Sequence, residues 1–213
     1  MPIPLGILAT TGAGGVAPNN QWAVSLLNST STVISARIAL GADSSNNSYF
    51  LSLINPSNTQ YIWKYDALGT LVFQRKITVP ADSLLQYGIV DSSGNVYLSG
   101  YSYPTSGFGR HLTVVISSTG TITWQRELAY SGSYYTSRGI QRDSSGNIYS
   151  TGEFQFGGAV HKYNSSGTLQ WAKSLDGGNF ESLGTMSLDS SANIYSNGYV
   201  SGYSPAASSG LVA

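Results

Sequence analysis

The chain has 213 residues, ten basic and ten acidic side chains, and no cysteine. This length suffices for one sizeable all-β domain, and the balanced charge argues against nucleic acid or an anionic membrane as a partner. The absence of cysteine excludes a disulfide framework and a thiolate zinc site. Charged residues make up only 9% of the chain, whereas Gly (25) and Tyr (15) are abundant, which is typical of short strands and tight turns.

Residues 1–21 stand apart from the rest of the chain. The opening run, residues 1–9, is apolar but lacks the basic leader and long apolar core of a signal peptide. No window of the chain approaches the ~20 apolar residues that span a bilayer. Residues 10–20 (TTGAGGVAPNN) form either a flexible arm or an arm that docks on a neighbouring subunit, and the aliphatic residues of the opening run favour docking. We expect no export by the usual route and no membrane insertion.

A ten-residue motif organises the remainder of the chain. It reads DSSGNVYLSG at Asp91–Gly100, returns at Asp143–Gly152 and Asp189–Gly198, and has a degenerate copy at Asp43–Ser52. Asp or Ser accepts a local backbone hydrogen bond and Gly permits a positive φ, so the motif predicts a tight turn. Four copies at a period of about 50 residues indicate a repeat architecture.

A second motif keeps the same period. It reads KYNSSGTLQWAK at Lys162–Lys173, with earlier forms at Lys64–Arg75 and Val115–Arg126. Its aromatic anchors, spaced by 51, 51 and 47 residues, are Trp22, Phe73, Trp124 and Trp171. The two motifs together fix the register of the repeats.

Each period contains four short segments that favour strands. In the second period they are Leu71–Ile77, Leu85–Val90, Val96–Tyr101 and Leu112–Ser117. Four antiparallel strands per repeat of ~40–50 residues form the pattern of a β-propeller blade. A β-helix has shorter coils and ranks second, and an immunoglobulin-like sandwich would not repeat its turns so closely. We therefore predict an all-β propeller with approximate blades 22–70, 71–121, 122–168 and 169–213.

The fourth repeat is expected to be incomplete. Aligned on the third repeat, residues 210–212 fall on residues 158–160, so the chain stops inside the fourth strand of the fourth blade. This predicts a longer native polypeptide. The alternatives are a four-bladed ring and a ring that another subunit completes.

One cation recurs on an otherwise apolar face of the aromatic strand. It is Arg75, Arg126 or Lys173, on the same face as the aromatic anchor. The one acid that recurs in step is the Asp that begins the ten-residue motif. We hypothesise that this Asp either pairs with the cation of its own blade or caps its turn. The first blade has Val24 at the cation position, so Asp43 should lack this partner.

No stretch carries recognisable catalytic chemistry, and an acid that recurs in every blade is structural on this argument. Glu153 and Glu181 can face one cavity, but no spacing pairs them as glycoside hydrolysis requires. His111 and His161 stand alone, without Cys, Asp or Glu in ligand spacing. The Asp-Ser-Ser-Gly-Asn turn lacks the further oxygen ligands of a calcium loop. We therefore assign no catalytic, cofactor-binding or metal-binding residue and expect no enzyme activity and no cofactor.

The tyrosines fall into two groups. Tyr97, Tyr149 and Tyr195 repeat in step and are expected to pack inside the fold. The others near Gly- and Ser-rich loops are Tyr101, Tyr103, Tyr130, Tyr134, Tyr135, Tyr199 and Tyr203. They serve either as ordinary loop anchors or as contacts to carbohydrate or protein, because the ring offers a stacking face and a polar tip.

The two motifs resemble a known repeat. Residues 143–152 followed by 162–173 are similar to the bacterial β-propeller repeat called the SBBP repeat, with its D-x-x-G-N-x-Y-x-x-G and K-Y-x-x-x-G-x-x-x-W elements. The resemblance covers residues 22–213; it is strong in the second and third repeats, weak in the first and truncated in the fourth. It implies a propeller, names no activity, and points to surface and secreted proteins.

The opening run, MPIPLGILA, resembles the start of structural proteins of tailed phages, especially those of marine and cyanobacterial hosts. This resemblance implies a virion component assembled in the host cytoplasm, in the tail, a fibre or the capsid. Residues 1–20 would dock on other virion proteins or on copies of the same chain, and the propeller would serve assembly or bind a host-surface glycan or protein. The second hypothesis is a bacterial cell-surface or secreted propeller that binds glycan or protein. The third is a propeller glycan hydrolase or lyase.

Overall fold

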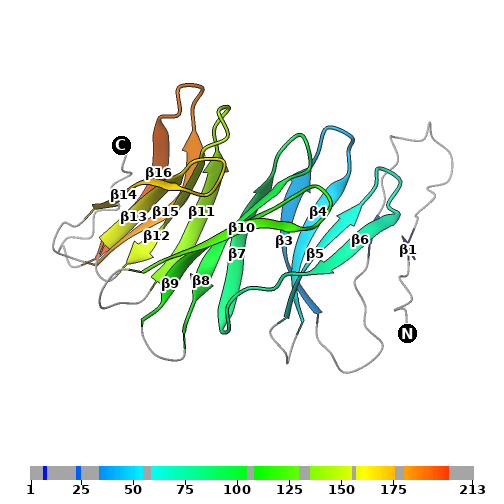
Figure 1. Cartoon of the computed structure of the whole chain (residues 1–213), viewed down its shortest axis with the longest axis horizontal. Coiled ribbons are helices and arrows are strands. Elements are labelled where there is room, and N and C mark those ends of the chain that lie inside the picture. Colours follow the sequence, from blue (N-terminus) through cyan, green and yellow to red (C-terminus); the bar gives the residue numbers. More distant parts are fainter. Residues whose placement is uncertain are drawn as a thin grey trace. The chain divides into compact units, whose positions relative to one another are not determined.

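The regular elements of the described chain are all β-strands. The computed structural model describes residues 7–8, 23–24, 34–54, 59–104, 108–129, 135–154, 157–175 and 180–201 (Figure 1). Over these ranges there is no helix of the length and hydrophobicity needed to cross a membrane.

Three four-stranded antiparallel sheets follow one another along the chain, and the strands of each sheet lie side by side in chain order. The first sheet consists of β3 (Ile34–Ala42), β4 (Ser48–Ile54), β5 (Thr59–Tyr65) and β6 (Leu71–Lys76). The second consists of β7 (Ser83–Val90), β8 (Val96–Ser102), β9 (Arg110–Ile116) and β10 (Ile122–Leu128). The third consists of β11 (Tyr135–Arg142), β12 (Ile148–Phe154), β13 (Gly157–Tyr163) and β14 (Leu169–Leu175).

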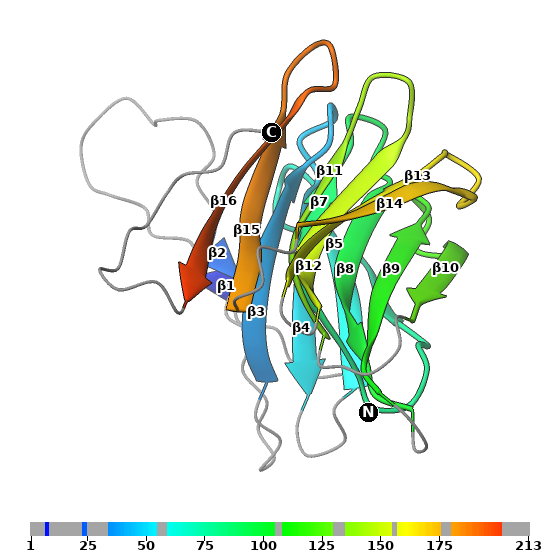
Figure 2. The ribbon, with the colours of Figure 1, turned by 90° about the vertical axis from the view of Figure 1, so that its left-hand side faces the viewer.

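A fourth sheet has two described strands, β15 (Phe180–Leu188) and β16 (Ile194–Ser201), which run antiparallel as a twisted ribbon (Figure 2). The succession of up-and-down sheets, one per sequence repeat, is the blade pattern of a β-propeller. The prediction of an all-β propeller is therefore confirmed.

The sheets are out of phase with the predicted blade limits by one strand. The aromatic strand β6 was expected to begin a blade, but it closes the first sheet by pairing with β5. The reason is local: a short turn at residues 66–70 joins β5 to β6 as a hairpin, whereas residues 77–82 separate β6 from β7. Consecutive strands joined by a short turn pair with each other.

The described strands group into two compact units. The first sheet, with residues 90–94, forms one unit, and the other three sheets form the second. Within the second unit, β11 packs against β8 of the preceding sheet and β15 of the following sheet. The buried core cluster between the second and third sheets consists of Tyr97, Val115, Trp124, Ile140, Ile148 and Tyr163. These aromatic and branched residues face inward because strand side chains alternate.

The ten-residue motif forms a tight turn that its Asp holds together. Asp143 Oδ1 accepts a hydrogen bond from the backbone N–H of Asn147 (2.8 Å). Asp143 Oδ2 accepts hydrogen bonds from Asn147 Nδ2 (2.7 Å) and from the Tyr149 hydroxyl (3.1 Å). The same three bonds recur around Asp43 and Asp189. The Asp caps its own turn, which was one of its two hypothesised roles.

The recurrent cation does not pair with this Asp. The Arg126 guanidinium lies over the Trp124 ring, 5.7 Å from its centroid, and Nε donates to the Gly167 carbonyl oxygen at 2.8 Å. Arg75 and Lys173 also lie over the aromatic anchors of their own strands. The pairing hypothesis is wrong because a cation two residues from an aromatic ring on the same strand face reaches that ring first.

Asp43 was expected to lack the cation that an aromatic strand supplies, and its cationic partner comes from a different strand. Lys64 Nζ lies 3.5 Å from Asp43 Oδ2. Lys64 pairs with Tyr49 across β5 and β4, and its ammonium group lies 5.1 Å from the centroid of the Tyr49 ring. The cation therefore comes from β5 and not from the aromatic strand.

At the N-terminal end, β1 (Ile7–Leu8) pairs antiparallel with β2 (Ala23–Val24). The other residues of the predicted arm, 1–21, lie outside the described part of the chain. Residues 202–213, where the fourth blade was expected to break off, also lie outside it. The docking arm and the incomplete blade therefore stay predictions.

Candidate functional site

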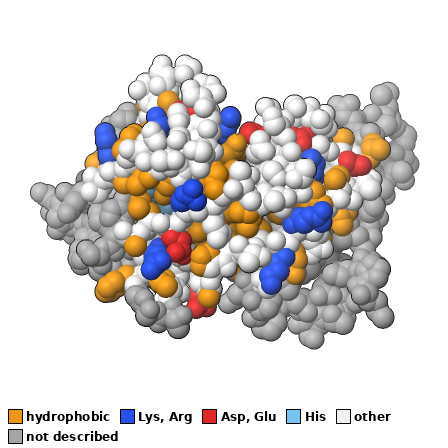
Figure 3. Space-filling view, viewed as in Figure 1, with side chains coloured by type: hydrophobic (Ala, Val, Ile, Leu, Met, Phe, Trp, Pro, Cys, Tyr) orange, Lys and Arg blue, Asp and Glu red, His pale blue; other side chains and the backbone are white. Residues whose placement is uncertain are grey.

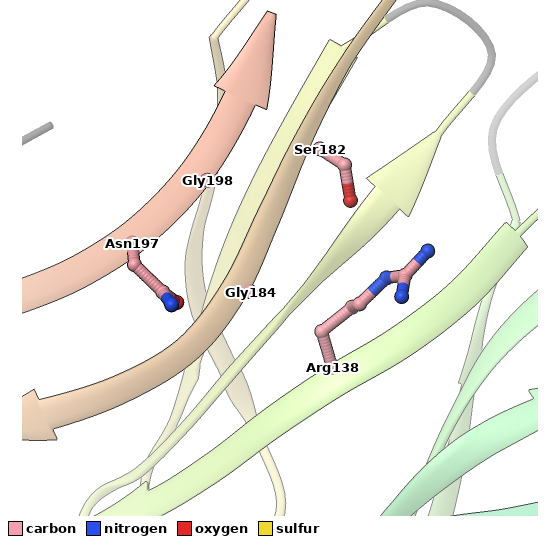
Figure 4. A pocket seen from close by; sticks show the side chains of 5 residues that line it. All are labelled: Arg138, Ser182, Gly184, Asn197 and Gly198. Atoms are coloured by element: carbon pink, nitrogen blue, oxygen red, sulfur yellow. The ribbon is translucent and has the colours of Figure 1, made fainter. Parts of the chain in front are cut away.

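A small pocket opens in the second unit between β11 and the β15–β16 ribbon. Its volume is about 180 Å³, and its lining residues are Arg138, Ser182, Gly184, Asn197 and Gly198 (Figure 4). The side chains of Arg138 and Ser182 point from β11 and β15 into the same space (Figure 4). This volume is well below the roughly 300–1,000 Å³ of a drug-binding cleft.

A β-bulge places Arg138 at this pocket. The register of β11 against β12 shifts between Ser137 and Gly139, so Arg138 is the extra residue of the bulged strand. A bulge breaks the alternation of side chains and re-aims the extra one. Arg138 can therefore reach the space next to β15.

Arg138 forms an ion pair with a buried acid. Its Nη2 atom lies 3.3 Å from Oε2 of Glu153, which is on β12. The same oxygen accepts a hydrogen bond from Thr136 Oγ1 at 3.4 Å. Glu153 is only 5% exposed, so the carboxylate fixes the guanidinium and offsets its charge.

Two donor groups at the pocket are buried without a hydrogen-bond partner among the described residues. They are Arg138 Nε and Ser182 Oγ, and Ser182 is 3% exposed. Leaving such a group unsatisfied costs about 1–3 kcal/mol. Folded proteins retain few such groups, and a water molecule or a ligand in the pocket could complete the bonding of these two.

The residues around the pocket depart from the repeat. Five residues before the motif Asp stands Gln86 in the second blade, Arg138 in the third and Gly184 in the fourth. Seven residues before it stand Leu84, Thr136 and Ser182. Ten residues after it, Glu153 replaces the Tyr of the neighbouring repeats, Tyr101 and Tyr199. Sequence reasoning missed Arg138, Ser182 and Asn197, although these departures from the repeat include the positions of Arg138 and Ser182.

The prediction that Glu153 and Glu181 can face one cavity is not tested. Glu153 lies beside the pocket through its bond to Arg138, but the side chain of Glu181 lies outside the described part. Among the other acids, Asp66 and Asp91 accept backbone N–H groups of their own turns. Glu127 accepts hydrogen bonds from Ser102 and Arg110.

His111 and His161 do not stand alone, as the sequence suggested, but lie against each other. Their ring centroids are 4.6 Å apart, and each residue is 1% exposed. Burial lowers the pKa of His111 to about 4. Burial also holds the pKa of His161 well below its usual value, and electrostatic repulsion from His111 contributes less to this shift. Both rings are neutral at physiological pH. In the described part of the chain, no group of three or more His, Cys, Asp or Glu could hold a metal ion.

The tyrosine predictions are met in part. Tyr97 and Tyr149 are buried, but Tyr195 is 43% exposed because no described strand continues the sheet beyond β16. Of the loop tyrosines, Tyr101 and Tyr103 contact each other edge to face, with centroids 5.1 Å apart. The side chains of the other five lie outside the described part: Tyr130, Tyr134, Tyr135, Tyr199 and Tyr203.

The surface offers no extended charged patch on the face that Figure 3 shows. Among the described residues there, Lys and Arg side chains are scattered over polar and hydrophobic surface, and some lie next to Asp or Glu (Figure 3). A ligand would therefore be recognised by local contacts and not by a broad electrostatic field.

The fold and the pocket define a β-propeller with a small pocket in its second unit. No family model matches the chain, and no curated protein matches its sequence. A solved structure of streptogramin B lyase, a propeller-like protein, is similar at 15% identity and a TM-score of 0.50, over 80% of this chain and 56% of that chain. A protein of unknown function from Bacteroides caccae is similar at 11% identity and a TM-score of 0.49, over 77% and 53%. The chain thus spans about half the length of these structures, and the likeness concerns the fold alone.

Proposed function

We propose that the chain is a non-enzymatic β-propeller of a tailed-phage virion, in the tail, a fibre or the capsid. Its N-terminal segment docks on other virion proteins or on copies of itself, and its propeller serves assembly or binds the host surface. The virion assignment is supported by the resemblance of residues 1–9 to phage structural proteins, and surface display by the SBBP-like motifs.

One observation supports the non-enzymatic part of the proposal. The recurring acids Asp43, Asp143 and Asp189 use both carboxylate oxygens to hold their own turns. Glu127 and Glu153 are engaged in ion pairs. General acid–base chemistry needs a carboxylate within reach of a substrate proton, and these five carboxylates have structural partners instead.

Mass spectrometry of density-purified particles tests the virion assignment. We expect peptides of the chain at constant stoichiometry to the major capsid protein through successive purification steps. Absence from particles, with recovery from a bacterial envelope or culture medium, would overturn the assignment and favour a cell-surface or secreted binding propeller.

A propeller glycan hydrolase or lyase is the second candidate. It is favoured by the burial of Glu153 next to a pocket and by the fold likeness to a structure of streptogramin B lyase. Glu153→Ala and Glu181→Ala variants would be compared with the unmodified chain in a glycan-cleavage assay. We expect no cleavage by any of the three; cleavage that Glu153→Ala abolishes would establish the enzyme instead.

A further inference from the structure

The pocket between β11 and β15 presents hydrogen-bonding groups that the described chain does not use. Arg138 Nε and Ser182 Oγ are buried without a described partner. The Asn197 amide adds a third polar group at the wall, where its Oδ1 also accepts a hydrogen bond from Thr185 Oγ1 at 3.3 Å. A ligand that reaches these groups gains hydrogen bonds that the described residues do not supply.

The charge of the pocket selects the kind of ligand. Glu153 lies 3.3 Å from the Arg138 guanidinium and offsets its charge. An anion would meet the carboxylate as well as the guanidinium, so the site offers it little net attraction. A hydroxyl group suits the site better because it both accepts and donates hydrogen bonds. It can accept from Arg138 Nε–H and exchange donor and acceptor roles with Ser182.

The size and construction of the pocket agree with this choice. A volume of about 180 Å³ leaves room for one small ring. Gly184 lines the wall where Arg138 stands in the preceding repeat. A Cβ atom at Gly184 would clash with Asn197 Oδ1, so a larger residue there would displace the amide. The fourth blade therefore keeps this position small, while the third supplies the guanidinium.

We propose that this pocket binds a neutral, hydroxyl-rich group, namely one sugar ring of a glycan. The proposal rests on the proposed function, since it assigns the host-surface contact of the propeller to Arg138, Ser182 and Asn197. It adds the ligand class and the place of binding.

Ligand titration by NMR with the full chain tests the proposal. The probes are a panel of neutral monosaccharides, glucuronic acid and inorganic sulfate. We expect at least one neutral sugar to bind more tightly than both anions. Failure of every neutral sugar to bind at millimolar concentration, or tighter binding of sulfate, would overturn the proposal.

Ser182→Ala locates the binding site. Removal of one neutral hydrogen bond should weaken sugar binding about five- to tenfold. The variant should unfold no earlier than the parent, because the deleted hydroxyl is buried without a described partner. Ser150→Ala is the matched control, since Ser150 Oγ is also buried without a described partner but lies away from the pocket lining. Unchanged affinity in Ser182→Ala, or equal losses in both variants, would contradict the assignment.

The two proposals fail separately. A chain that is found in virions but binds no neutral sugar removes only the pocket assignment. A chain that binds sugar through Ser182 but is absent from virions removes only the virion assignment.

Discussion

At the scale of the residue, the Asp of each turn does more than occupy a turn position. In the turns of Asp43, Asp143 and Asp189 it accepts the backbone and side-chain donors of the Asn four residues on and the hydroxyl of the Tyr six residues on. The repeated Tyr therefore has a polar role as well as a packing role. This explains why Asp, Asn and Tyr recur together at fixed spacing.

Loss of this Asp should destabilise the third blade. Asp143→Ala leaves Asn147 and the mostly buried Tyr149 without their acceptor. We expect a loss of about 1–3 kcal/mol in the free energy of unfolding, measured by urea denaturation. Asp189→Ala should cost less, because its partner Tyr195 is exposed to water that can replace the lost bonds. Equal losses in the two variants would contradict this account.

Stability should fall as the pH drops from about 6.5 to about 4. Burial lowers the pKa of His111 to about 4 from its usual 6.5, so the unfolded chain takes up the proton first. Protons then favour unfolding throughout this window. His111→Gln should show a shallower decline in denaturation midpoint between these pH values than the unmodified chain. Parallel declines would show that the histidine pair does not set the acid response.

A second acid step should follow at lower pH. Burial acts to raise the pKa of Asp43, but hydrogen bonds from Asn47, Tyr49 and Ser45 outweigh it and bring the pKa down from 3.8 to about 2. The unfolded chain again binds the proton first, so the contribution of Asp43 is lost as the pH falls from 3.8 to 2. An acid titration of intrinsic fluorescence should therefore show a further loss of structure below pH 3.8 that Asp43→Asn reduces.

At the scale of the element, a contact between β10 and the turn before β14 links the second and third sheets. Trp124 Nε1 donates to the Ser165 carbonyl oxygen at 3.1 Å. Two residues on, Arg126 donates to the Gly167 carbonyl oxygen. Gly167 has a φ of +79°, and a Cβ atom there would lie 2.6 Å from the Trp124 ring. The aromatic anchor therefore holds the turn of the next blade as well as the core.

Two glycines of similar backbone conformation should respond differently to alanine. Gly146 has a φ of +85°, but its nearest non-neighbouring atom is the flexible end of Arg142, at 3.3 Å from a built Cβ. The equivalent position of the fourth blade is Ala192, with a φ of 62°. Gly146→Ala should therefore cost only about 1–2 kcal/mol, whereas Gly167→Ala should cost about 3 kcal/mol or more because the Trp124 ring must move. Urea denaturation of the two variants distinguishes them, and equal costs would contradict the proposed contact.

At the scale of the whole molecule, the sequence predicted the fold through its repetition. Strands β6 to β9 agree with the segments expected in the second period to within about two residues because the turn motifs mark their ends. The period alone did not predict which strand begins each sheet, since a repeat can begin at any strand. The short connection between β5 and β6 and the longer one between β6 and β7 decide where the first sheet ends.

The candidate site was much less predictable. Arg138 reaches the pocket through a bulge, and Ser182 meets it only when two sheets pack together. Neither event leaves a local motif. His111 and His161 are 50 positions apart in the chain, so their contact also arises only when two sheets pack together. The sequence does show the positions where one repeat departs from the others. Such departures from a regular pattern are expected at functional sites.

The composition of the chain governs its behaviour in solution. Ten basic and ten acidic side chains cancel, and charged residues are only 9% of the chain. Molecules with no net charge do not repel one another, so solubility should pass through a minimum near neutral pH. Precipitation by polyethylene glycol across pH 5 to 9 measures this. Changing the exposed Leu68 to Asp should move the minimum to lower pH and raise solubility at pH 7, because the substitution adds a negative charge and removes a side chain that is 70% exposed. A minimum that stays in place after the substitution would show that association is driven by apolar contacts elsewhere and not by the absence of net charge.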